Sequence, residues 1–139
     1  MQCQKGLGSE PRMRNIYYAH AMCMYGEPEE YQEIALIRRR LRGSRIVNPA
    51  SYSGLPEKLR DGVKFCLRIV ETCQVVVFSR LLGEVTAGVG KEVNHALKIG
   101  VPVFELKAGK LVSRTRPVEY MSRAATKRLY RKWRGFGPN

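Results

Sequence analysis

The 139-residue chain has no long hydrophobic run, and its first residues lack the apolar stretch of a signal peptide. No segment approaches the roughly 18 consecutive apolar residues that a membrane span needs. Residues 1–13 are polar and rich in glycine, which predicts a flexible N-terminal segment and leaves Met13 as a candidate natural start. We therefore expect one cytoplasmic domain with no membrane partner.

Cysteine and histidine motifs are also missing. The four cysteines form no CxxC pair, and the two histidines are not spaced for zinc. Gly88 and Gly90 match neither the G-x-G-x-x-G fingerprint nor a P-loop, so neither dinucleotide binding nor nucleoside triphosphate hydrolysis is indicated. We expect reduced structural thiols, no metal ion and no cofactor, with the cysteines at positions Cys3, Cys23, Cys66 and Cys73.

Acidic residues are scarce: the sequence has 12 Asp and Glu residues and 25 Lys and Arg residues, which gives a net charge of +13. The segment from Lys107 to the end holds ten of the basic residues and one acid, Glu119, and so supplies +9 of that charge. Such a tail attracts nucleic acid, acidic partners or anionic ligands. The simpler interpretation is the solvated face of a helix on a basic protein.

Strand and helix patterns alternate along the chain, which predicts an α/β fold with a mostly parallel sheet of four or five strands. The expected strands are 14–19, 45–47, 73–79, 101–106 and an edge strand at 110–114; the expected helices are 29–42, 56–73, 86–100 and a last one from Pro117. We predict a three-layer, flavodoxin- or Rossmann-like domain over 14–116, in the strand order 2-1-3-4 plus the edge strand. The basic helix and tail at 117–139 should pack on the same domain. A ligand cleft is expected above strands one and three, where the order reverses.

The helix predicted over 56–73 carries an apolar stripe. Its members recur at offsets of four and three, which predicts that all of them are buried: Leu59, Val63, Cys66, Val70 and Cys73.

Glu92 is the first candidate for chemistry, about one turn into the helix that follows strand three. The helix dipole favours its ionised form, and an ionised carboxylate in a cleft can attack an electrophilic sugar carbon. The alternative is a surface glutamate. No basic residue lies four positions away, although His95 is a possible partner three positions on.

Small residues precede Glu92 at the start of the same helix. Thr86, Ala87, Gly88 and Gly90 would let free backbone N–H groups approach a phosphate or a sugar hydroxyl, and Thr86 could cap the helix itself. The alternative is that the glycines allow close packing of the helix on the sheet.

Further candidates come from the ends of the first three strands. Tyr17 could hydrogen-bond the Glu92 carboxylate, or be a core aromatic. His20 and Met22 could contact a base, and Asn48 could contact a ligand or only shape the Asn-Pro turn. Ala19 and Ser79 complete the predicted substrate-binding set.

Taken together, these segments resemble the nucleoside 2-deoxyribosyltransferase-like superfamily over roughly residues 14–106. The matching motifs are Ile16-Tyr17-Tyr18-Ala19, Ile46-Val47-Asn48-Pro49 and Gly88-Val89-Gly90-Lys91-Glu92. The resemblance implies a retaining double displacement: Glu92 attacks the anomeric carbon and releases the base, Tyr17 orients Glu92, and groups near Thr86 and Gly88 hold the sugar or a 5′-phosphate. It also implies a homodimer or larger homo-oligomer.

This chain differs from the family pattern at two positions, where Gln74 and Thr86 stand in place of acidic or serine residues. Thr86 carries no charge that would repel a phosphate, which favours a nucleoside 5′-monophosphate as the ligand. The same differences favour a second hypothesis, a non-catalytic nucleotide-binding or sensing module. A third is nucleic-acid binding by the last helix, with Tyr130 and Trp133 stacking on bases between the basic residues Arg123, Lys127, Arg128, Arg131, Lys132 and Arg134.

Overall fold

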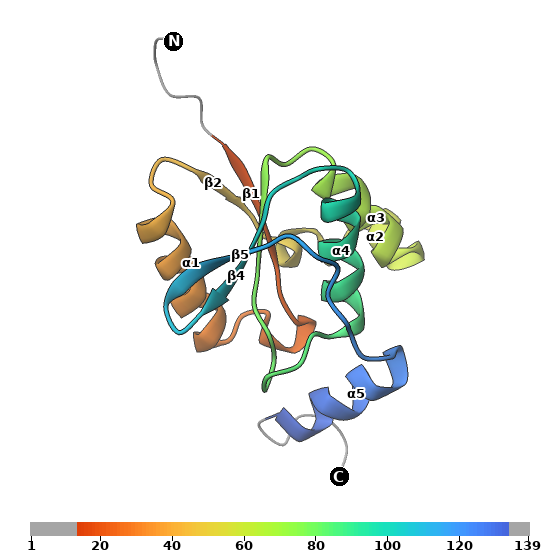
Figure 1. Ribbon diagram of the computed structural model, residues 1–139. Helices are drawn as coiled ribbons and strands as arrows, with labels where there is room; N and C mark the ends of the chain where they lie inside the picture. The colour runs from red at the N-terminus through yellow and green to blue at the C-terminus, as the bar shows by residue number, and fades with distance from the viewer. Residues whose placement is uncertain (1–13, 134–139) are drawn as a thin grey trace, which may run out of the picture.

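A computed structural model describes residues 14–133. Its centre is one five-stranded sheet in the order β2-β1-β3-β4-β5 (Figure 1). The strands are β1 (Asn15–Ala19), β2 (Arg45–Val47), β3 (Val75–Phe78), β4 (Val103–Lys107) and β5 (Lys110–Arg114). The first four are parallel, and β5 returns antiparallel along β4. The predicted fold class, strand order and edge strand are confirmed.

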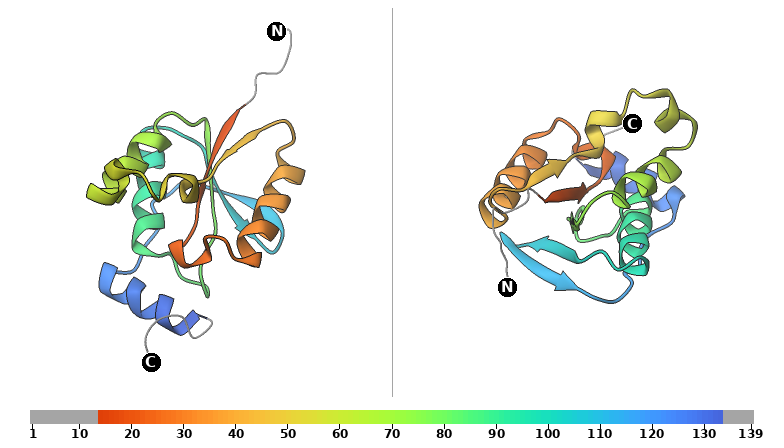
Figure 2. Two further views of the ribbon diagram at one scale, coloured as in Figure 1. Left: turned by 180° about the vertical axis from the view of Figure 1, so that it is seen from behind. Right: turned by 90° about the horizontal axis from the view of Figure 1, so that it is seen from above.

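Helices cover both faces of the sheet (Figure 2). On one face, Ile37 of α1 (Pro28–Arg40) packs with Ile16, Tyr18 and Val77 of the sheet. On the other face, α3 (Gly62–Val70) and α4 (Ala87–Lys98) pack on a cluster that includes Tyr17 and Val76. Alternate residues of β1 therefore serve opposite faces, as the pleat of a strand requires, and both faces are apolar, as in buried parallel sheets.

The single helix predicted over 56–73 is wrong. The chain forms α2 (Pro56–Arg60) and then α3, broken at Asp61, whose side chain accepts a hydrogen bond from the Lys64 N–H and caps α3. Because the two helices do not share one axis, the predicted stripe is interrupted, and Leu59 (73% exposed) and Val63 (39% exposed) face solvent. Cys73 follows α3 and is buried as predicted, and the described thiols of Cys23, Cys66 and Cys73 are all free.

The last helix, α5 (Arg123–Lys132), begins six residues after the predicted start at Pro117. Ser122 accepts a hydrogen bond from the Ala125 N–H and sets this start. Residues 115–122 instead form an extended segment that leads from β5 to α5. Figure 1 shows α5 beneath the N-terminal start of α4, beyond the carboxyl ends of the parallel strands.

Helix α5 packs against the loops after β1 and β3 through a small apolar cluster. The side chains of α5 and its C-cap in the cluster are Leu129, Tyr130 and Trp133. They pack on Ala21, Cys23 and Met24 of the loop after β1 and on Leu81 of the loop after β3. Two short 3-10 turns, Met22–Met24 and Pro49–Tyr52, follow β1 and β2. The flexible segment predicted at 1–13, and the tail after Trp133, lie outside the described residues. In the described part of the chain, no helix is long and apolar enough to cross a membrane.

Candidate functional site

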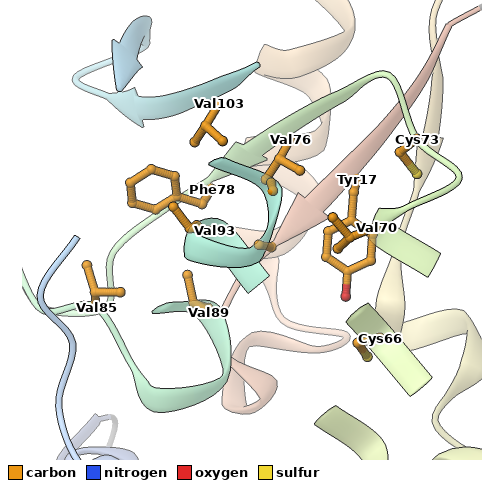
Figure 3. Close-up of a cluster of buried hydrophobic side chains, with 12 residues drawn as sticks. Tyr17, Cys66, Val70, Cys73, Val76, Phe78, Val85, Val89, Val93 and Val103 are labelled. Carbon is orange, nitrogen blue, oxygen red and sulfur yellow. The ribbon is translucent and has the colours of Figure 1, made fainter. Parts of the chain in front are cut away.

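Tyr17 is placed by the central strand. It pairs with Val47 of β2 on one side and Val76 of β3 on the other, so it sits where the strand order reverses. Its side chain is fully buried on the face covered by α3 and α4. Figure 3 shows the ring rising from β1 with its hydroxyl directed towards Cys66 of α3.

Glu92 meets this hydroxyl from α4. The Tyr17 hydroxyl donates to Oε2 of Glu92 at 3.0 Å, across 75 positions of sequence. Glu92 is only 9% exposed, so the pair is largely removed from water. The predicted meeting of the two residues is therefore found, and a surface glutamate is excluded. His95, the alternative partner, instead contacts Glu71 at 2.7 Å.

Burial decides the ionisation of Glu92. Removal from water raises its pKa from 4.5 to about 7, against hydrogen bonds from Tyr17 and Cys66 and the positive charge of Lys58, all of which favour the carboxylate. The helix dipole favours the carboxylate, as predicted, but burial raises the pKa, so the group is mostly protonated below about pH 7 and mostly ionised above it. Near neutral pH the carboxyl group exchanges between its two forms, the range in which acid–base groups work best.

Aromatic hydroxyls and one cation surround the carboxyl group. Burial raises the pKa values of Tyr17 and Tyr25, and the negative charge of Glu92 adds to both shifts. The Lys58 Nζ lies 5.4 Å from the centre of the Tyr25 ring and donates to the Pro49 carbonyl. Lys58 and Tyr25 were absent from the predicted site. Neither belongs to a recognisable motif, and only the packing of α2 and of the loop after β1 brings them close to Glu92.

The N-terminus of α4 is partly occupied by the protein itself. Thr86 is in the N-cap position, but its side chain makes no capping bond, so the predicted cap is wrong. The Ala87 N–H, expected to be free for a ligand, donates to Oγ1 of Thr126 in α5 at 3.0 Å. By contrast, the Gly88 N–H meets no acceptor among residues 14–133, and a Cβ there would have no neighbour within 4 Å. Gly88 is the open position at this helix end.

Gly90 serves packing. A Cβ at this position would lie 2.2 Å from Cγ of Tyr120, so the Tyr120 ring rests on the backbone of α4. Only glycine permits this approach without displacement. The close-packing alternative therefore accounts for Gly90.

Two predicted ligand contacts, His20 and Asn48, are engaged by α1. His20 is buried, stacks on Tyr18 with ring centroids 3.8 Å apart, and contacts Oε2 of Glu30 through Nε2 at 2.7 Å. Burial lowers the pKa of His20, while the Glu30 carboxylate acts in the opposite direction. Asn48 donates to the same Glu30 oxygen at 3.3 Å and accepts from the Ala50 N–H. These side chains join α1 to the sheet.

Ser79 and Ala19 are also engaged within the protein. The Ser79 hydroxyl donates to Oε1 of Glu33 at 2.7 Å, and the Tyr18 hydroxyl donates to the same oxygen. Ala19 is fully buried, and its carbonyl accepts from the Ser79 N–H. The sequence analysis did not predict that Glu30 and Glu33 bind these side chains, because acidic residues on a surface helix are usually solvated. Their offset of three places both on one face of α1, and this was the one signal in the sequence.

Met22 is the predicted contact that stays open, with 57% of its surface exposed. Its backbone N–H donates to the Tyr130 hydroxyl of α5 at 3.1 Å. Tyr130 and Trp133 pack in the apolar cluster beneath α5, so both rings have a structural role, and the stacking of bases on them stays a prediction. The aromatic rings anchor the helix, and the basic side chains remain outside.

Gln74 lies away from the carboxyl group. It precedes β3, at the opposite end of the strand from Ser79, and its Oε1 accepts from the Asn15 N–H at 2.7 Å. The difference from the family pattern at this position therefore has a structural reason, the joining of β1 to β3, and does not alter the surroundings of Glu92.

Comparison of the chain with protein-family models, with curated proteins and with solved structures gives no match. Within residues 14–133, no three His, Cys, Asp or Glu side chains lie close enough together to hold a metal ion.

Proposed function

We propose that this protein cleaves or exchanges the N-glycosyl bond of a nucleoside or nucleoside 5′-monophosphate by a retaining mechanism, as the resemblance to nucleoside 2-deoxyribosyltransferases implies. The observation that carries the proposal is the buried hydrogen bond between Tyr17 and Glu92 at the reversal of strand order. Ligands of open α/β sheets bind outside the carboxyl ends of the strands at this point.

In the proposed mechanism, Tyr17 holds Oε2 of Glu92, and Oε1 attacks the anomeric carbon. A carbon–oxygen bond forms as the carbon–nitrogen bond breaks, and the base leaves with the bonding electron pair and takes a proton from solvent. Water or a second base then attacks the same carbon and gives up a proton to solvent, and the Glu92 carboxylate leaves with the electrons that it brought. Two inversions give net retention.

In this proposal, the N-terminus of α4 binds a phosphate or a sugar hydroxyl of the ligand beside this carboxyl group. The Gly88 N–H is available, and the dipole of α4 favours an anion at its N-terminus. Because Thr126 already satisfies the Ala87 N–H, we expect fewer backbone donors to the ligand than the sequence predicted.

The test is release of free base from deoxynucleoside 5′-monophosphates, followed by chromatography. Glu92→Gln should abolish release, and Glu84→Gln, which changes an exposed carboxylate in the loop before α4, should leave it intact. Since the nucleophile must be ionised, the wild-type rate should rise with pH and level off above about 7, the pKa of Glu92. Release that survives Glu92→Gln would remove Glu92 from the mechanism.

A non-catalytic nucleotide-binding module is the second candidate, favoured by the contact of α5 with the helix end. The hydrogen bonds from Ala87 to Thr126 and from Met22 to Tyr130 hold α5 across that end. For such a module, nucleotides would raise the melting temperature with no base released. The homo-oligomer implied by the resemblance remains a prediction, which sedimentation analysis would test directly.

A further inference from the structure

The segment between β5 and α5, residues 115–122, is fixed along one flank of α4. The Asn94 side chain accepts from the Val118 N–H at 2.8 Å and donates to the Val118 carbonyl at 3.0 Å. Tyr120 rests on Gly90, and the Met121 N–H donates to the Val85 carbonyl. Positions 90 and 94 share one side of a helix, whereas position 92 is turned about 200° from position 90. The segment therefore lies on the flank of α4 opposite the Glu92 carboxyl group.

A groove with a volume of about 480 Å³ lies beside this segment. Its lining is dominated by arginines and hydroxyl groups and consists of Arg80, Ser113, Arg114, Thr115, Arg116, Pro117, Val118 and Glu119. Ligand pockets are commonly about 300–1,000 Å³, so the groove has room for more than a single inorganic ion.

Glu105 of β4 holds two of these arginines in place. It is 2% exposed and accepts from Nε of Arg80 at 2.8 Å and from Nε and Nη2 of Arg114 at 2.9 and 2.8 Å. The side chains of Arg80 and Arg114 remain 38% and 31% exposed, so one edge of each guanidinium is fixed and the other faces outward. Arginines positioned in this way lose little conformational entropy when they bind an anion.

Arg116 adds an uncompensated charge. Among residues 14–133, it has no acidic partner. The groove and its surroundings hold three guanidinium groups and two carboxylates, the buried Glu105 and the exposed Glu119, so positive charge is in excess. The Ser113 and Thr115 hydroxyls supply neutral donors. The surface therefore combines positive charge, planar donors and hydroxyl donors, the groups that recognise phosphate oxygens.

We propose that this groove is a binding site for a phosphate-bearing ligand, separate from the Glu92 site, in which Arg116 and the outward edges of Arg80 and Arg114 contact phosphate oxygens. The phosphate belongs either to a small organic or condensed phosphate or to the backbone of a nucleic acid. Both sources present the same oxygens to the guanidinium groups, and the test separates them.

The experiment uses two probes: inorganic tripolyphosphate, which has no N-glycosyl bond and is measured by calorimetry, and a labelled single-stranded oligonucleotide, which is measured by fluorescence anisotropy. The variant is Arg116→Gln, which removes no ion pair among residues 14–133. The matched control is Arg39→Gln, which removes the same charge from the exposed surface of α1 on the other face of the sheet. Glu92→Gln tests separation from the first site.

We expect Arg116→Gln to weaken binding of at least one probe about tenfold, while Arg39→Gln and Glu92→Gln change it less than about twofold. A selective effect on tripolyphosphate identifies a small phosphate, and a selective effect on the oligonucleotide identifies a nucleic acid. Equal weakening by Arg116→Gln and Arg39→Gln would reduce the binding to net charge and overturn the proposal, as would failure of the wild type to bind either probe. Failure of the wild type to release any base, with phosphate binding intact, would refute only the proposed function.

Discussion

Replacing Glu92 with glutamine should make the protein more stable at neutral and alkaline pH. In the unfolded chain the carboxyl group titrates near its ordinary pKa of 4.5, and burial raises that value to about 7 in the folded protein. Between these two values the unfolded chain has lost its proton and the folded protein still holds it. The wild type therefore loses stability as pH rises through this interval, by about 1.4 kcal/mol for each unit of difference, or about 3 kcal/mol in total.

Glutamine has nearly the same shape and does not ionise. Its Oε1 can still accept the hydrogen bond from Tyr17, so the main packing and hydrogen bonding should persist. At about pH 4 the two proteins should be equally stable, since the wild-type carboxyl group is protonated in both states. The advantage of Glu92→Gln should grow as pH rises and reach at most about 3 kcal/mol at about pH 8. Urea unfolding at a series of pH values gives the difference directly.

Glu84→Gln is the matched control, because it makes the same chemical change at an exposed position in the loop before α4. Its effect should stay within about 0.5 kcal/mol at every pH. A difference between Glu92→Gln and wild type that is constant with pH would refute the reasoning, because it would mean that the Glu92 carboxyl group titrates alike in the folded and unfolded states. A variant less stable than wild type at about pH 8 would mean that the ionised carboxylate is stabilised in place.

Two further changes test the neighbours of this group. Tyr17→Phe removes a hydrogen bond that favours the Glu92 carboxylate. The pKa of Glu92, followed by NMR titration, should therefore rise, and the free energy of unfolding should fall by about 1 kcal/mol. An unchanged titration would contradict the assigned contact. In α4, Gly90→Ala should cost about 1–3 kcal/mol in thermal or urea unfolding because the new methyl group meets Tyr120, whereas Gly88→Ala, with open space around its Cβ, should gain about 0.5 kcal/mol. Equal effects of the two alanines would exclude the packing role of Gly90.

The sheet was predictable because its signals are local. Each central strand is a short apolar run between turn residues, and alternating strands and helices restrict the sheet to few topologies. From that topology alone, the end of β1 and the helix after β3 come together at one edge. The meeting of Tyr17 and Glu92, far apart in sequence, followed from this geometry and needed no knowledge of side-chain packing.

The surroundings of the site were not predictable in the same way because they depend on contacts between elements. From the sequence, the polar side chains at the strand ends could be assigned to a ligand. In the structure they bind Glu30 and Glu33 of α1 instead, as His20, Asn48 and Ser79 show. The break between α2 and α3 had a local signal in Asp61-Gly62, and the start of α5 had one in Ser122, both typical of helix beginnings. The position of α5 over the start of α4 had no such signal.

The ionisation of Glu92 depends on more than the local rules that could be applied to the sequence. The dipole of α4 and the Tyr17 hydroxyl both favour a carboxylate, and each acts over a short distance. Desolvation depends instead on everything packed around the group, including Tyr25 from the loop after β1 and Tyr130 from α5, whose own pKa values are raised by burial. Removing α5 would readmit water to this region and should lower the pKa of Glu92 towards its ordinary value. NMR titration of a chain that ends before α5 tests this prediction: an unchanged pKa of Glu92 would mean that α5 does not exclude water from the carboxyl group.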